Sequence, residues 1–465
     1  MLKLRKTVAI LVGKMLINLS RMLGNQGSNL PGRVALKIYP PLLGELAQNT
    51  YKDSFIITGT NGKTTTTNMV AEIFKANGSS YVHNQAGANM LSGITTAFIR
   101  QTNFSGRRFH DYALLETDEA NVPLLLTVIK PRLILITNFF RDQLDRYGEL
   151  DITINLIKEA VRDTDIELLL NADDPLQSHF SKETGLSCQY YGFGDTDYDS
   201  FNGAESREGR YCVFCGHELD YQRYHYAQLG QYHCSQCNNH NPKSQFIGHE
   251  LLMNPHIHMQ VNDIVLESPY QGFFNAYNIL AAVSLARLAG IEAQIIKIAL
   301  ANFQPRAGRM EAFNIGGKRT ILVLVKNPTG LNQSLAMLGQ DKADKNLFIA
   351  LNDNAADGRD ISWIWDAEME LIADCEARVK RVICSGQRSG DIAVRVKYGG
   401  YNTENIIINT SLKEGIEMAI GMDSEVSYIL CTYTALFASR KILAKMQKKY
   451  PGIEPGKERT LEKAR

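Results

Sequence analysis

The stretch Ser54-Phe-Ile-Ile-Thr58, followed by Gly59-Thr-Asn-Gly62-Lys63-Thr-Thr65, decides the class of fold. Its first five residues are mostly apolar or β-branched, which is typical of a buried strand. The Gly-rich segment follows at once, and Thr66–Ala76 has the pattern of a helix. A Gly-rich turn between a strand and a helix offers backbone N–H groups, aided by the helix dipole, to an anion. We therefore predict a phosphate-binding loop in an α/β fold.

The candidate nucleotide-binding residues are those of the loop itself: Gly59, Thr60, Asn61, Gly62, Lys63, Thr64 and Thr65. In such loops the lysine reaches the outer phosphates and the following hydroxyl holds Mg²⁺, which assigns these roles to Lys63 and Thr64. The spacing departs from the usual loop, because Gly59 precedes Gly62 by only three residues. The other interpretation is a purely structural turn.

Apolar runs that end at polar residues continue the pattern along the chain. They are Tyr112–Leu115 before Glu116, Leu133–Ile136 before Thr137 and Asn138, and Glu167–Leu170 before Asn171. Helical stretches such as Asp151–Val161 lie between them, so we expect a doubly wound, mostly parallel sheet with its ligand at the strands' carboxyl ends. Glu116 is then a candidate Mg²⁺ ligand beside Thr64; the alternative is a surface acid at the start of a helix.

Composition narrows the class of protein. The chain has 465 residues with 50 Lys and Arg against 49 Asp and Glu, and 44% of its residues are hydrophobic. The balanced charge argues against a nucleic-acid binder, and the hydrophobic content excludes fibrous and wholly disordered proteins. Eight cysteines are too few for a disulfide scaffold and fit a reducing cytoplasm.

Four of the cysteines form two C-x-x-C pairs, Cys212 with Cys215 and Cys234 with Cys237. They lie in a stretch at about 195–248 that interrupts the alternating strands and helices, so we interpret it as an insertion. Four thiolates at this spacing are typical of a closed, structural Zn²⁺ site of the zinc-ribbon kind. Four unrelated reduced cysteines are the alternative.

The chain divides into three parts by pattern. We expect residues 1–50 to form a basic helical segment, 51–305 a nucleotide-binding central domain with its insertion, and 306–465 a smaller C-terminal α/β domain. The first acidic residue is Glu45, and no apolar run reaches the length of a membrane span. A basic amphipathic helix there either lies on an anionic leaflet or packs on the domain behind it with a solvated basic face, and we favour the second interpretation.

The sequence resembles the Mur ligases and folylpolyglutamate synthases. Motifs in the order of that family are ITGTNGKTTT, TNFFRDQLD, LNADDP, FFNAYNILAA and FQPRAGRME. Four further features resemble the branch that supplies the synthetase subunit of a lipid II-amidating enzyme: LPGRVALKI, the Cys₄ insertion, LVKNPTGLNQSL and LNDNAADGRDISWIWD. The resemblance covers nearly the whole chain and implies a Mur ligase-like fold.

The resemblance implies an ATP- and Mg²⁺-dependent ligase of peptidoglycan synthesis that amidates the α-carboxyl of D-glutamate in the lipid II stem peptide, through an acyl phosphate. Ammonia would come from a separate, GatD-like glutaminase subunit. Matched by motif, Asn275 and Asn278 contact the nucleotide and Arg309 contacts phosphate, with Lys63 and Arg309 as catalytic cations. Helix capping or packing is the alternative role for the two asparagines.

Departures from the family leave several points open. Gln143 stands where the family has a metal-binding histidine, and residues 323–328 lack the family's acid for ribose recognition. Lys158 lies near the position of a carbamylated lysine, although we favour a solvated helix lysine. The phosphate loop begins too early for a uridine-nucleotide domain before it, which fits a lipid-linked substrate at the inner membrane surface. We expect a cytoplasmic protein that is not integral to the membrane, with peripheral contact at the inner face as an open alternative.

Three acids crowd the segment before the two tryptophans Trp363 and Trp365, namely Asp353, Asp357 and Asp360. Trp is frequent at interface hot spots, and the resemblance implies that one of these acids completes the partner's Cys–His pair. We favour Asp360, with helix capping as the alternative. Cys384 lacks a preceding glycine and a nearby histidine, so we expect no glutaminase here. The rival functions are an amino-acid-adding ligase and a non-catalytic nucleotide-binding scaffold.

Overall fold

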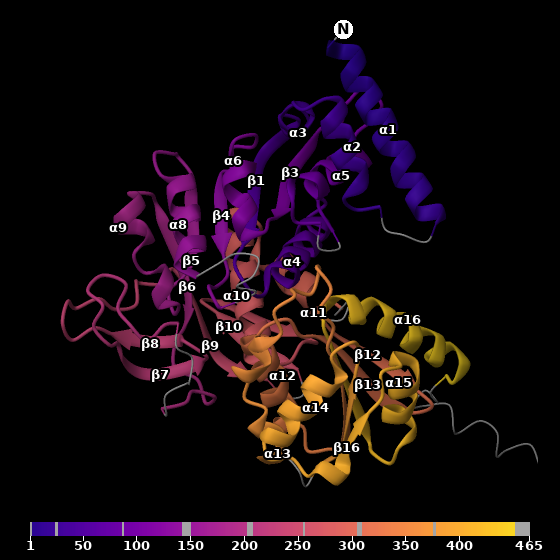
Figure 1. The fold of residues 1–465 in the computed structure, drawn as a ribbon. Helices are drawn as coiled ribbons and strands as arrows, with labels where there is room; N and C mark the ends of the chain where they lie inside the picture. The colour runs from indigo at the N-terminus through magenta and orange to yellow at the C-terminus, as the bar shows by residue number, and fades with distance from the viewer. Residues whose placement is uncertain are drawn as a thin grey trace, which may run out of the picture. The chain divides into compact units, whose positions relative to one another are not determined.

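The computed structural model describes residues 2–23, 27–85, 88–141, 150–201, 208–253, 256–304, 309–374 and 378–451. The chain forms two compact units, the first of Met1–Phe140 and Glu149–Phe303 and the second of Arg141–Gly148 and Gln304–Arg465 (Figure 1). Each unit is built on its own mostly parallel sheet with helices on both faces. The predicted α/β class with parallel sheets is confirmed.

The first unit contains a nine-stranded sheet in the order β11-β10-β9-β6-β5-β4-β1-β3-β2. All neighbours from β2 to β9 are parallel, whereas β10 and β11 are antiparallel additions at one edge. The strands are β1 (Thr50–Thr58), β2 (Tyr81–His83), β3 (His110–Glu116), β4 (Leu133–Ile136), β5 (Glu167–Asn171), β6 (Cys188–Phe193), β9 (Phe246–Leu252), β10 (Ile257–Val261) and β11 (Ile264–Ser268).

Both faces of this sheet are covered, which the side-chain alternation of β1 makes plain. Phe55 and Ile57 belong to one core, and Ile56 between them belongs to the other. The first core includes α4 (Lys63–Ala76), α10 (Phe273–Leu288) and α11 (Ala293–Ala301). The second includes α1 (Leu2–Met22), α2 (Leu30–Ile38), α3 (Leu42–Ala47), α5 (Leu91–Gln101), α6 (Val122–Leu126), α8 (Leu150–Val161) and α9 (Phe180–Thr184). Short 3₁₀ turns η1 (Glu119–Asn121) and η2 (Pro175–Gln177) follow β3 and β5.

The strand order reverses direction at β1. From β1 the chain passes to the β2 edge, returns to β3, and then crosses to β4 on the other side of β1. Such a reversal opens a crevice at the carboxyl ends of the strands, where ligands bind in open α/β sheets. The phosphate loop follows β1 and therefore lies at this position.

Helix α1 buries one side against α2 and α5, with Ala9, Ile10 and Ile17 in the core. Its N-terminal part is held by polar contacts, because Arg5 donates to the carbonyl of Ile38 at 2.9 Å and Lys6 pairs with Glu45 at 2.8 Å. The packing expected for this helix is therefore present. The expected solvated cations are present as well, since Lys3, Arg5 and Arg21 are exposed, but the sequence pattern did not reveal that the exposed side also carries a row of apolar residues.

The cysteine-bearing stretch adds a small antiparallel hairpin, β7 (Asp220–Tyr226) with β8 (Leu229–His233). β9 already begins at Phe246 and pairs in parallel with β6. The last residues of the stretch expected as an insertion, up to Gly248, thus belong to the main sheet. The sequence pattern did not reveal this, because β9 is only partly buried and lacks a continuous apolar run.

The second unit has a six-stranded sheet in the order β12-β13-β17-β14-β15-β16, parallel except for β12. Its strands are β12 (Arg309–Ile315), β13 (Lys318–Leu324), β14 (Lys345–Ala350), β15 (Val379–Ser385), β16 (Ile406–Ile408) and β17 (Val426–Cys431). One face packs on α12 (Pro328–Gln340), η3 (Ser362–Trp365), α13 (Glu370–Asp374) and α14 (Ser389–Tyr398), the other on α15 (Leu412–Gly421) and α16 (Tyr433–Lys449); η4 (Thr403–Asn405) precedes β16.

Candidate functional site

The phosphate loop joins the end of β1 to the first turn of α4. The helix begins at Lys63, three residues earlier than the sequence predicted, because Gly62 adopts φ +88° and turns the chain directly into it. A Cβ on Gly62 would lie 2.1 Å from Oδ1 of Asn278, so only glycine fits. The loop therefore brings the N-terminus of a fourteen-residue helix to its mouth, a geometry suited to an anion.

The ammonium group of Lys63 is buried, and oxygen atoms of the protein accept its hydrogen bonds. It donates to the carbonyls of Gly59 and Thr60 and pairs with Oε2 of Glu119 at 3.0 Å. Both side chains of the ion pair are 9% exposed. Sequence reasoning missed Glu119, although it is the third acid of the run Glu116–Glu119 and lies in η1, one short loop after β3.

Thr64 and Glu116, the two predicted Mg²⁺ ligands, lie side by side. The Thr64 hydroxyl donates to Oε1 of Glu116 at 3.0 Å. Glu116 is the last residue of β3 and is buried, and its backbone is fixed by Asn84, which bonds both its N–H and its carbonyl. A hydroxyl and a carboxylate at this separation form an oxygen donor set of the kind that Mg²⁺ prefers.

The segment after β4 holds the phosphate loop in shape. The backbone N–H of Thr60 donates to the carbonyl of Asn138, and the N–H of Asn61 donates to the Asn138 side chain, both at 2.9 Å. The Thr137 hydroxyl donates to the carbonyl of Asn61 at 2.7 Å. These contacts position the loop from the neighbouring strand.

Asp174, in the LNADDP motif, fixes that segment in turn. Its wholly buried carboxylate accepts from the backbone N–H of Phe139 at 2.8 Å, from Leu176 N–H at 3.2 Å and from the Gln177 amide at 3.0 Å. Burial raises the pKa of Asp174 to about 6, against the opposing effect of these hydrogen bonds. The adjacent Asp173 is also buried, and burial raises its pKa as well.

Asn275 and Asn278 lie on α10 against the base of α4. Asn278 accepts from the Thr66 hydroxyl at 3.3 Å and donates to Oδ1 of Asn275 at 3.2 Å. Both asparagines are buried. The structure thus places Asn278 in contact with the phosphate loop and the helix it leads into, which positions it to fix their shape.

Three other predicted positions have different outcomes. Lys158 is not a solvated lysine: it is buried and pairs with Glu183 at 2.7 Å, because α9 packs beside α8. Gln143 lies outside the described residues. Arg309 begins β12 in the second unit, and its side chain is likewise outside the described part of the structure.

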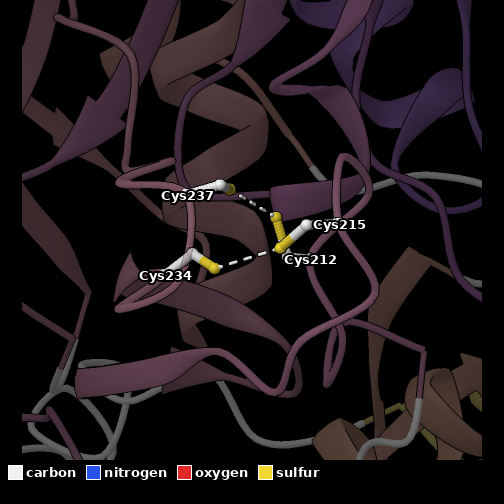
Figure 2. Close-up of side chains that lie close together, drawn as sticks. All are labelled: Cys212, Cys215, Cys234 and Cys237. Atoms are coloured by element: carbon white, nitrogen blue, oxygen red, sulfur yellow. Dashed lines mark hydrogen bonds between the residues drawn. The ribbon is translucent and has the colours of Figure 1, made fainter.

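The four paired cysteines converge on one point (Figure 2). Sγ of Cys212 lies 3.5 Å from that of Cys237, Cys215 and Cys234 are separated by the same distance, and all four sulfurs lie within 4.8 Å of one another. Tetrahedral Zn–S bonds of about 2.3 Å would separate the sulfurs by about 3.8 Å. The observed distances fit such an ion.

The two C-x-x-C loops have matching backbones. In the first, Gly216 N–H donates to the carbonyl of Cys212, and in the second, Asn238 N–H donates to that of Cys234, both at 2.8 Å. Gly216 and Asn238 both have positive φ, at 73° and 62°. Two equivalent turns aim their sulfurs at a shared centre, which four unrelated cysteines would not do.

The three acids of the second unit have different surroundings. Asp357 is buried and accepts from both the backbone N–H and the hydroxyl of Thr434. Asp353 pairs with Arg388 at 3.0 Å. Asp360 is partly exposed and accepts from Ser362 N–H at 2.8 Å at the start of η3, and the N–H and hydroxyl of Ser362 lower its pKa. Asp360 thus bonds the first N–H of η3 from one position before its N-cap, Ile361, and this contact leaves Asp360 partly exposed.

Cys384 lies in β15 with its side chain buried, and burial raises the pKa of its thiol to about 12. A thiol of this kind is a poor nucleophile. Among the helices of the described ranges, none is long and apolar enough to cross a bilayer.

Comparisons with known proteins find the same group of relatives for both units of the chain. The Mur ligase middle domain matches residues 57–286, and the MurT ligase C-terminal domain matches 324–436. The subunit MurT of lipid II isoglutaminyl synthase (glutamine-hydrolyzing) from Staphylococcus aureus (strain COL) is 39% identical over 394 residues, which cover 85% of this chain and 88% of the relative. The MurT subunit from Streptococcus pneumoniae (strain ATCC BAA-255 / R6) is 36% identical over 450 residues, covering 96% and 98%.

Solved structures share the fold. A pseudomurein peptide ligase type C from Methanothermus fervidus aligns with TM-score 0.63 and 21% identity, covering 85% of this chain and 79% of that one. A folylpolyglutamate synthase from Mycobacterium tuberculosis, complexed with ADP and AMPPCP, aligns with TM-score 0.58 and 13% identity, covering 92% and 98%.

Proposed function

The chain belongs to the MurT family of lipid II isoglutaminyl synthase subunits, and from this premise we propose that it is an ATP-dependent ligase of peptidoglycan synthesis. Its substrate is the α-carboxyl group of D-glutamate in the lipid II stem peptide at the inner face of the membrane. Its product is the corresponding amide, D-isoglutamine. The ammonia comes from a glutaminase partner subunit.

One observation carries the proposal within this chain: the phosphate loop stands beside a ready donor set for Mg²⁺. The N-terminus of α4 and the ammonium of Lys63 receive the phosphates of ATP, and Lys63 exchanges Glu119 for a phosphate oxygen when the nucleotide enters. The Thr64 hydroxyl and Oε1 of Glu116, which are 3.0 Å apart, would hold the metal ion. Bound Mg²⁺ supplies charge neutralisation on the transferred phosphoryl group.

The reaction has two steps, phosphoryl transfer and amide formation. A carboxylate oxygen of D-glutamate attacks the γ-phosphorus of ATP, and the bond to the bridging oxygen breaks to release ADP. Ammonia then forms the C–N bond at the acyl carbon, the bond to the phosphate oxygen breaks, and a proton is lost. Lys63 stabilises the charge that develops in the first step, and the family resemblance assigns Arg309 the same task.

The cysteine cluster is proposed to hold a structural Zn²⁺. Four thiolates fill the coordination shell and leave no position for a substrate. The ion would fasten the C-x-x-C loops beside the β7–β8 hairpin, which belongs to the first unit together with the phosphate loop. The cluster thus contributes rigidity to that unit and takes no part in the chemistry.

The second unit is proposed to contact the glutaminase, with Asp360 completing the partner's Cys–His pair. Burial and hydrogen bonding to Thr434 occupy Asp357, and Arg388 neutralises Asp353. Asp360 remains partly exposed with a lowered pKa, and it lies at the start of the short segment that ends with the half-exposed Trp365. An accessible carboxylate in the same segment as an exposed aromatic ring suits an interface that orients a histidine.

ADP release in the presence of lipid II and ammonium tests the ligase. We expect lipid II-dependent release that Lys63→Ala abolishes and Lys75→Ala retains, since Lys75 is an exposed lysine near the other end of the same helix. ADP release that requires an amino acid instead of ammonium would identify an amino-acid-adding ligase. No release even with the glutaminase partner and glutamine would indicate a nucleotide-binding scaffold.

A further inference from the structure

Helix α1 is apolar on two opposite sides. The side buried against α2 and α5 contains Ala9, Ile10 and Ile17. The outer side exposes a second row spaced by three and four residues, between 39% and 85% exposed: Leu4, Val8, Leu11, Met15, Leu19 and Met22. This spacing places all six on one helix face. We call them the outer stripe; it is about 27 Å long at 1.5 Å per residue.

An unbroken exposed stripe of this size is unusual on a protein surface and marks an interaction site. Helix α1 runs along the outside of the first unit, with no described element covering the stripe (Figure 1). The fold does not need these six side chains, because the helix is already anchored by its inner side and by the contacts of Arg5 and Lys6.

The exposed charges of α1 and of α2, which packs against it, are all positive. Seven cations and no acid precede Glu45 in the sequence. After Arg5 and Lys6 are taken up by internal contacts, exposed cations remain on α1 and α2: Lys3, Arg21, Arg33 and Lys37. This charge opposes docking of a second copy, which would bring like charges together, and it favours a surface rich in phosphate.

A loop beside α1 repeats the same chemistry. Residues 103–109 (NFSGRRF) place Gly106 against Lys6 and Ile10, and the Phe104 ring lies 5.6 Å from the ammonium of Lys14. The loop exposes two phenylalanines and two arginines. Apolar and aromatic groups mixed with cations are what an interfacial membrane-binding element requires.

We propose that α1 docks this chain on an anionic lipid bilayer, lying parallel to the membrane with the outer stripe in the head-group region and the surrounding cations on lipid phosphates. The docking goes beyond the proposed function, because it requires neither ATP nor lipid II. It would hold the ligase at the surface where a lipid-linked carboxylate is presented.

Flotation of the full-length chain with vesicles tests the docking, without ATP or lipid II. One vesicle preparation contains phosphatidylglycerol and phosphatidylcholine, and the other contains phosphatidylcholine alone. We expect binding to the first, weakening as salt is raised, and little binding to the second. The variant L11Q/M15Q/L19Q should bind at least about tenfold more weakly, since three inserted apolar side chains are lost.

The matched control is L252Q/V265Q/I298Q, which changes three similarly exposed apolar residues of the same unit elsewhere on its surface. It should bind as the unchanged chain does. Failure of the unchanged chain to bind phosphatidylglycerol vesicles, or equal binding by the stripe variant, overturns the proposal. A concentration-dependent dimer that the stripe variant loses, without vesicle binding, would assign the stripe to a second copy instead.

Amidation in detergent micelles separates this proposal from the proposed function. The stripe variant should amidate detergent-solubilised lipid II normally while failing to bind vesicles. Lys63→Ala should bind vesicles normally while failing to amidate. If the stripe variant loses amidation in micelles as well, the stripe serves the reaction itself and the docking role is wrong.

Discussion

Replacing Asp174 by asparagine tests how the buried acid behind the phosphate loop contributes to stability. The carboxylate receives three N–H donors, from Phe139, Leu176 and Gln177. Asparagine keeps one acceptor oxygen and turns an NH₂ group toward donors that need an acceptor. This mismatch should destabilise the first unit by about 1–3 kcal/mol at any pH.

Asp174 also makes a pH-dependent contribution to the free energy of unfolding, and the direction of its pKa shift fixes the sign of that contribution. Burial raises the pKa of Asp174 from 3.8 to about 6, so the folded state binds a proton more tightly than the unfolded state does. The resulting stabilisation is complete below the unfolded pKa and is lost as the pH rises through the folded one. Between about pH 5 and about pH 7.5 the loss is about 1.4 kcal/mol, one pKa unit's worth. Asparagine cannot titrate and lacks this contribution.

Hydrogen exchange of the β1 and β4 amides at both pH values measures the effect, after correction for intrinsic exchange rates. It reports the opening free energy of the first unit alone. Asp174→Asn should cost about 1.4 kcal/mol more at the lower pH than at the higher. Equal costs at the two pH values, or a greater cost at the higher one, would refute the reasoning.

Three further changes probe the site. Gly62→Ala should weaken ADP binding at least about tenfold in calorimetry, because residue 62 has a left-handed backbone and its new Cβ would collide with Asn278. The control Gly78→Ala, also at positive φ but with open space around it, should bind ADP normally. Equal ADP affinities of the two variants would contradict the account. Glu119→Gln should lower the melting temperature more without nucleotide than with Mg·ATP, since phosphate replaces it as the partner of Lys63; equal lowering would argue against that exchange. Native mass spectrometry should find about one zinc per chain, lost with serine at all four cluster cysteines; a zinc-free chain would exclude the site.

Local patterns predicted much of the fold. The strand at Leu133–Ile136 has the bounds expected from its apolar run, and the loop at Gly59–Thr65 lies between a strand and a helix as its glycines indicated. The spacing of the two C-x-x-C pairs likewise indicated that the four sulfurs would lie together. In each case the residues that determine the conformation are neighbours in sequence, so the local sequence pattern is enough to predict that conformation.

Contacts between distant segments could not be predicted in the same way. The Lys63–Glu119 pair and the burial of Lys158 against Glu183 depend on which helix packs beside which. The second apolar face of α1 was missed for a related reason: its cations dominate the sequence, and only the packing of α1 shows which apolar residues remain outside. Such features depend on tertiary structure.

The mass of the muropeptide recovered from lipid II tests the central claim most directly. After incubation with ATP, Mg²⁺, glutamine and the glutaminase partner, we predict that the hydroxyl of the D-glutamate α-carboxyl is replaced by NH₂, and that fragmentation places the amide there. Omitting ATP, or using Lys63→Ala, should leave the muropeptide unchanged. An unchanged mass in the complete reaction, or a mass raised by an amino-acid residue, would contradict the assignment as an amidating ligase.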